Sequence, residues 1–203
     1  MADFRYMIPF VCHFAGGVFG KDGCELDLPD RDIFELAKLR GWSDDADDPG
    51  GATMVDVTLA TFSIFRGRRA TKGELRNIGF DEWQSILKGM FWDRCGADGI
   101  ESQGLAHLIV DWVWASGPGV LRRVQKLFGV VPDGKIGPLS LKAINGSDQG
   151  VMFRRLMTER ERYYRRCGAA WKYLDGWLRR LHAIQPDGSF IIYGKRIKGK
   201  GPA

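Results

Sequence analysis

Residues 47–53 read Asp-Asp-Pro-Gly-Gly-Ala-Thr, and the chain then runs into Val-Thr-Leu-Ala-Thr-Phe at residues 57–62. Proline fixes one backbone angle and the paired glycines permit angles that other residues avoid, so this stretch predicts a tight turn that lets the backbone approach a ligand. Thr53, Asp56 and Thr58 are expected near the N-terminus of the following helix, where free N–H groups favour acceptors and anions. Composition alone favours an ordinary helix-capping loop.

Apolar residues recur at helical spacing over most of the chain. The clearest cases are residues 81–91, with Asp81 as the expected N-cap, and residues 105–114, which are apolar on several faces and predict a central buried helix. Sustained strand alternation is absent, which disfavours an α/β sheet fold. The predicted fold class is all-α, with at most a minor short strand or hairpin. Further helices are expected at residues 30–41 (capped by Asp30), 121–128, 138–144, 153–166 and 171–181, and a short strand at 190–193.

Composition and charge narrow the class of protein. The 203 residues are 44% hydrophobic, which excludes wholesale disorder. The net charge of +5 is uneven, because the part from Val151 onward carries 13 Lys and Arg against 4 Asp and Glu. This excess predicts an anionic partner such as an acidic envelope polymer, although a solvated helical face explains it equally well. Nucleic acid is not expected, because no helix-turn-helix, RNA-recognition or zinc-finger pattern accompanies the basic residues Arg154, Arg155, Arg162, Arg165, Arg166, Lys195, Arg196, Lys198 and Lys200.

Neither metal nor membrane insertion is indicated by the sequence. The four cysteines, at positions 12, 24, 95 and 167, lack C-x-x-C spacing and are expected to be buried thiols, so we predict no metal site and no cofactor. No apolar run is long enough to cross a bilayer. Residues 1–14 contain Pro9 and lack a net positive leader, so we interpret them as a first helix rather than a signal peptide.

Three blocks stand in a fixed order along the chain. They are Asp-Pro-Gly-Gly-Ala-Thr at 48–53 with Val-Thr-Leu at 57–59; Phe-Trp-Asp at 91–93 with Asp-Trp-Val-Trp-Ala-Ser-Gly at 111–117; and Val-Gln-Lys-Leu-Phe-Gly-Val at 124–130 with Ile-Gly-Pro at 136–138. Together they resemble the family-108 glycoside hydrolases, which are bacterial and phage N-acetylmuramidases also described as secretion activator proteins. The resemblance implies a lysozyme-like helical fold, with a muramidase region at residues 1–95 that has an insertion near 19–46. A peptidoglycan-binding-like region at 96–182 and a basic tail at 183–203 would follow.

The resemblance also implies a chemistry, hydrolysis of the β-1,4 bond between N-acetylmuramic acid and N-acetylglucosamine. Such cleavage needs a protonated carboxyl group, which the family supplies as a Glu at the end of its first helix. Here Ala15 occupies that position, and losing a general acid costs a factor of roughly 10²–10⁴. Met54 and Asp56 also replace the Asn and Gly that the family favours. Two functions therefore stay open: a muramidase with a relocated acid, or a degenerate relative that binds cell-wall glycan without cutting it.

Three carboxylates are candidates for a relocated acid. Glu25 lies in the insertion, Asp56 beside the Gly-Gly turn, and Asp111 within an apolar helix. The alternatives are structural: solvent exposure for Glu25, a cap on the helix near Val57 for Asp56, and a pair with an Arg for Asp111. The expected partner is the peptidoglycan glycan strand, met at the cell wall or periplasm after export from a bacterial or phage-infected cytoplasm. The candidate substrate-binding residues are Asp48, Gly50, Gly51, Thr53, Thr58 and Trp112, although most Trp residues sit on helical stripes typical of a core.

Overall fold

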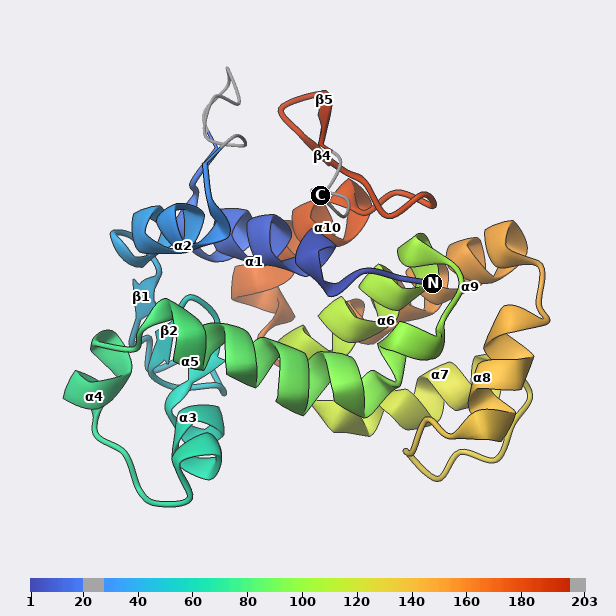
Figure 1. Ribbon diagram of the computed structural model, residues 1–203, viewed down its shortest axis with the longest axis horizontal. Coiled ribbons are helices and arrows are strands. Elements are labelled where there is room, and N and C mark those ends of the chain that lie inside the picture. The colour runs from blue at the N-terminus through green and yellow to red at the C-terminus, as the bar shows by residue number, and fades with distance from the viewer. Residues whose placement is uncertain (20–27, 198–203) are drawn as a thin grey trace. The chain divides into compact units, whose positions relative to one another are not determined.

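A computed structural model describes residues 1–19 and 28–197, and it is mainly helical (Figure 1). The predicted fold class is therefore confirmed. The chain divides into two compact units, an N-terminal unit of Ile8–Ile86 and a C-terminal unit of Met1–Met7 with Leu87–Ala203. The domain boundary that the sequence places after residue 95 stays a prediction, because compactness alone does not define a domain.

The N-terminal unit combines short helices with a small antiparallel sheet of strand order β1-β2-β3. Its core is apolar and includes Phe10 of the first helix, Phe34 of the second and Trp83, all fully buried. The rings of Phe34 and Trp83 lie 5.1 Å apart, which fixes α2 against α5. The elements are α1 (Met7–Gly16), α2 (Asp30–Lys38), β1 (Trp42–Ser43), β2 (Thr53–Met54), β3 (Val57–Thr58), α3 (Leu59–Arg66), α4 (Lys72–Arg76) and α5 (Phe80–Ser85).

The C-terminal unit is built around α6 (Gln103–Ser116), which is buried over nearly its whole length. This confirms the central buried helix predicted at residues 105–114. Helix α9 (Gln149–Arg165) lies against both α6 and α10 (Ala170–Ala183) (Figure 1). The other elements are the 3₁₀ turns Phe4–Tyr6, Asp93–Cys95, Ala97–Gly99 and Pro118–Val120, with α7 (Leu121–Leu127), α8 (Pro138–Asn145), β4 (Phe190–Ile192) and β5 (Lys195–Ile197).

Two predicted N-caps are wrong by one or two residues. Helix α5 begins at Phe80 after Gly79, so Asp81 lies inside the first turn rather than at the N-cap. Helix α2 begins at Asp30 itself, with Pro29 in the capping position. In both places the acidic residue still favours the helix, because a negative charge in the first turn complements the helix dipole. Past α5 the chain continues as a π-helix, Ile86–Trp92, which the apolar spacing does not distinguish from an α-helix.

The strand predicted at residues 190–193 is confirmed as β4, which pairs antiparallel with β5. The three strands of the N-terminal unit were not predicted, because each has two residues and is too short to show alternation. Within the described residues, no helix combines the length and apolar character needed to cross a membrane.

Candidate functional site

Ala15 lies in the last turn of α1 and is partly exposed. The neighbouring Gly16 is buried, and a Cβ atom on it would clash with the backbone of Ala37 at the end of α2. Only glycine permits this close approach of the two helices. The chain then leaves α1 through Gly17, which is exposed and has φ of +63°. The end of α1 that corresponds to the family's acid position therefore packs closely against α2, with a methyl group at position 15.

The hairpin between β2 and β3 turns through two residues with positive φ, Val55 at 45° and Asp56 at 62°. Two left-handed residues are the signature of a type I′ turn, which matches the twist of paired strands but favours Gly, Asn or Asp. Val55 is β-branched and is held there by tertiary contacts. Its N–H donates to the carbonyl of Gly41 at 2.9 Å, its carbonyl accepts from the Trp83 indole at 3.0 Å, and its side chain is fully buried.

Asp56 therefore does not cap the following helix, and that structural alternative is wrong. Helix α3 begins at Leu59 and its N-cap is Thr58, whose hydroxyl accepts from the Thr61 N–H at 3.0 Å. Asp56 is partly exposed at the turn. Burial raises the pKa of the Cys12 thiol well above its ordinary value, and the charges of Asp30 and Asp56 raise it further. Cys12 lies in α1 three residues before Ala15, so the charge of Asp56 acts on this helix.

The Asp-Pro-Gly-Gly stretch folds into a tight turn, as predicted. The Asp48 carboxylate accepts from the Gly50 N–H at 2.8 Å, and the Asp48 carbonyl accepts from the Gly51 N–H at 2.9 Å. Gly51 has φ of +66°, which explains the need for glycine there.

The turn folds back onto the sheet. A Cβ atom at Gly50 would lie 3.4 Å from the methyl group of Thr58, and Thr53 pairs directly with Thr58 across β2 and β3. Five of the six predicted substrate-binding residues, Asp48, Gly50, Gly51, Thr53 and Thr58, therefore gather at one corner of the N-terminal unit. Their role in binding stays a prediction.

The sixth residue, Trp112, is fully buried in α6, where its ring packs edge-on against Tyr163 at 5.7 Å. A side chain with no exposed surface cannot stack on a sugar, so we do not retain Trp112 as a binding residue. Trp92 is also fully buried. The aromatic residue missed by the sequence analysis is Trp42 of β1, which is partly exposed and pairs with Met54. The Arg76 guanidinium lies 4.2 Å from its ring centroid.

Asp111 is likewise fully buried, and it holds two arginines. Its Oδ2 accepts from Arg160 Nη2 at 2.6 Å, and its Oδ1 accepts from Arg180 Nη2 at 2.7 Å and from Arg180 Nε at 3.0 Å. Arg160 also donates to the Tyr164 hydroxyl at 2.6 Å and 2.9 Å. Burial alone would raise the pKa of Asp111, but the charges of Arg180 and Arg160 outweigh it and hold the pKa below its usual range.

A carboxylate that stays ionised and inaccessible cannot donate a proton to a glycosidic oxygen, so we drop Asp111 as a candidate acid. The pairing with arginine that was its structural alternative is confirmed. Glu25 lies outside the described residues, as do Cys24, Lys198 and Lys200. The described cysteines are free thiols, with Cys12 and Cys95 buried and Cys167 partly so. Of the acids considered, Asp56 is the one whose charge acts on a described residue of α1, Cys12.

Two family models match consecutive parts of the chain. The model described as Glycosyl hydrolase 108 matches residues 37–117, and the model described as Predicted Peptidoglycan domain matches residues 120–182. Among solved structures, the chain is similar to that titled "Structure of Brucella abortus SagA", with 29% identity and a TM-score of 0.65 over 69% of this chain and 80% of that one. No curated protein matches the chain.

Proposed function

Because this chain belongs to the glycosyl hydrolase 108 family and carries a peptidoglycan domain after it, we propose that it binds the glycan strands of peptidoglycan at the cell wall without cleaving them efficiently. The observation that carries this proposal is Ala15. A lysozyme-like site needs a proton donor at the end of the first helix, and alanine has no proton to give.

The rest of the site supports binding. The turn at residues 48–51 and the paired Thr53 and Thr58 offer backbone groups and short hydroxyl-bearing side chains that are partly exposed at one corner. Sugar hydroxyl and acetamide groups are recognised by such groups, together with an aromatic face. Trp42 lies in the same sheet and is partly exposed, so it is the aromatic residue best placed to contact a sugar ring.

A second candidate function is hydrolysis of the MurNAc-GlcNAc bond with Asp56 as the acid. It is favoured by the position of this carboxylate, which is close enough to α1 to influence the Cys12 thiol. Asp56 is only partly buried, however, and a general acid is usually enclosed by apolar walls that keep it protonated. The first function therefore fits the geometry better.

The test uses purified peptidoglycan sacculi, with bound protein measured by co-sedimentation and released muropeptides by mass spectrometry. The wild-type chain should bind the sacculi but release almost no muropeptides. Ala15→Glu should raise release by about 10²–10⁴-fold, because it returns a proton donor to a preserved site, whereas Ala15→Gln of the same length should not. Failure of the wild type to bind would refute the proposal. Release by the wild type that disappears in Asp56→Asn would support the second function instead.

A further inference from the structure

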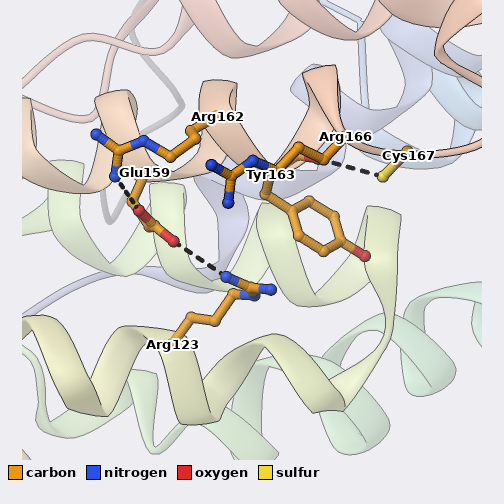
Figure 2. Close-up of a pocket in the computed structure, with 6 residues that line it drawn as sticks. All are labelled: Arg123, Glu159, Arg162, Tyr163, Arg166 and Cys167. Atoms are coloured by element: carbon orange, nitrogen blue, oxygen red, sulfur yellow. Dashed lines mark hydrogen bonds and ion pairs between the residues drawn. The ribbon is translucent and has the colours of Figure 1, made fainter.

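A small pocket of about 140 Å³ lies between α7 and α9 in the C-terminal unit. Figure 2 shows the six side chains that line it, of which one comes from α7 and the others from α9 and the residues directly after it: Arg123, Glu159, Arg162, Tyr163, Arg166 and Cys167. The pocket is far below the 300–1,000 Å³ that is typical of sites for drug-sized molecules, so it fits a single small group rather than a sugar chain.

The pocket carries more positive than negative charge. Glu159 accepts from Arg123 Nη1 at 3.1 Å and from Arg162 Nη1 at 2.7 Å, so one carboxylate is shared by two guanidinium groups (Figure 2). Arg166 is exposed and makes no ion pair with any residue in 1–19 or 28–197. Three arginines against one glutamate leave an excess of cationic donors around one cavity, which favours an anion.

The walls of the pocket are held in place. The Arg123 guanidinium lies 5.3 Å from the Tyr163 ring centroid, and Tyr163 packs edge-on against the buried Trp112. The Cys167 thiol donates to the Tyr163 carbonyl at 3.4 Å. Burial raises the pKa of the Tyr163 hydroxyl and the neighbouring Cys167 raises it further, so this hydroxyl remains a neutral group beside the arginines. Tyr163 and Arg123 are therefore already held by contacts within the protein, so they lose little freedom when a ligand binds.

We infer that this pocket binds a free carboxylate of a peptidoglycan stem peptide. The planar fork of arginine donors matches a carboxylate in two parallel hydrogen bonds, and a terminal carboxyl group with its short side chain suits the small cavity. All six residues lie within residues 120–182, which match the peptidoglycan domain. The inference rests on the proposed function only for the choice of polymer. It adds the stem peptide as a second point of contact beside the glycan.

Calorimetry tests the inference by measuring how tightly the full chain binds two synthetic stem tetrapeptides. One peptide has free carboxylates, and the other has every carboxylate amidated. The peptide with free carboxylates should bind at least about tenfold more tightly than the amidated one. Its binding should weaken as salt is added. Arg166→Gln should weaken its binding by about tenfold or more. Arg154→Gln is the matched control, because Arg154 is an exposed arginine of α9 that does not line the pocket, and it should leave binding unchanged. Glu159→Gln should tighten binding, because it removes the internal competitor.

Three results would overturn the inference. These are equal binding of the two peptides, equal effects of the Arg166 and Arg154 variants, and weakening by Glu159→Gln as large as by Arg166→Gln, which would mean that the cluster only supports the fold. Displacement of the peptide by an equal concentration of inorganic phosphate would assign the pocket to phosphate-bearing polymers instead. Glycan strands stripped of their stems are measured in parallel. If the wild-type chain does not bind these glycan strands, the proposed function is refuted. The peptide results alone decide this inference.

Discussion

The two units of this protein place their polar side chains in opposite ways. In the C-terminal unit, Asp111 and Arg160 are fully buried and satisfy each other within a network that also holds Arg180 and Tyr164. In the N-terminal unit, Thr53 and Thr58 lie in a three-stranded sheet whose strands are two residues long, Asp56 lies in the turn beside them, and all three stay partly exposed. Buried charges that lose a partner are very costly, whereas groups at a surface corner change at little cost. The first arrangement serves the fold, and the second is the one free to meet a ligand.

The largest effect should come from Asp111→Asn. Asparagine keeps the shape but removes the charge, and this leaves two buried or nearly buried guanidinium groups without their counter-ion. We expect the free energy of unfolding to fall by about 3–5 kcal/mol, measured by urea denaturation. Glu161→Gln is the control, because Glu161 pairs with Arg165 at the surface and should cost less than about 1 kcal/mol. Similar costs for the two variants would remove the contrast between a buried network and surface pairs.

The pH dependence of stability should reflect the same buried region through His107. Burial lowers the pKa of His107 from 6.5 to about 4 in the folded chain. The unfolded chain therefore takes up a proton as the pH falls below 6.5 while the folded chain does not. The stabilisation is complete above pH 6.5 and is lost as the pH approaches 4, by about 3 kcal/mol in all.

Urea denaturation between pH 7.5 and 4 measures this loss. His107→Gln should flatten the slope, whereas His182→Gln, which changes an exposed histidine, should leave it intact. A wild-type stability that does not change over this range would show that His107 titrates normally. A slope that persists in His107→Gln would place its origin in other groups.

Part of this contrast was predictable from the sequence, and part was not. The apolar residues of α6 recur on several faces of the helix, so its burial follows from the pattern, and a lone Asp in it demands a cationic partner. Which arginines provide the partner was not predictable, because Arg160 and Arg180 are 49 and 69 residues away along the chain. Both carry charge on helices that otherwise resemble solvated ones.

At the candidate site, sequence spacing predicted the tight turn at residues 48–51 but not the sheet beside it. Thr53 and Thr58 meet because a hairpin turns at Val55 and Asp56. Val55 is β-branched and buried, and such a residue gives no sequence signal for a left-handed turn. The same limit explains why Trp42 was missed and Trp112 was proposed. Both residues are tryptophans, so their residue type does not distinguish them. Only burial separates Trp112, in the core, from Trp42, which is partly exposed.

A smaller effect is expected in the N-terminal unit from Thr58→Ala. The Thr58 hydroxyl accepts from the Thr61 N–H and caps α3, so its loss should lower the free energy of unfolding by about 1 kcal/mol. Thr58→Ser keeps the oxygen and should recover most of that energy. If glycan binding, measured by co-sedimentation with sacculi, falls in Thr58→Ala but not in Thr58→Ser, the hydroxyl serves the ligand site as well as the helix. If Thr58→Ala lowers the free energy of unfolding nearly as much as Asp111→Asn, the contrast between the buried network and the partly exposed residues is contradicted.

The smallest expected effect distinguishes the backbone conformation of Asp56 from the role of its carboxylate. Asp56→Gly and Asp56→Ala both remove the carboxylate, but the residue has φ of 62°, where glycine fits and alanine is strained. The glycine variant should therefore be more stable than the alanine variant by about 1 kcal/mol in thermal or urea unfolding. Equal stabilities would mean that the hairpin relaxes away from the left-handed turn. Because the two variants differ in strain but share the loss of charge, any glycan-binding or cleavage defect common to both belongs to the carboxylate, and a defect in the alanine variant alone belongs to the shape of the turn.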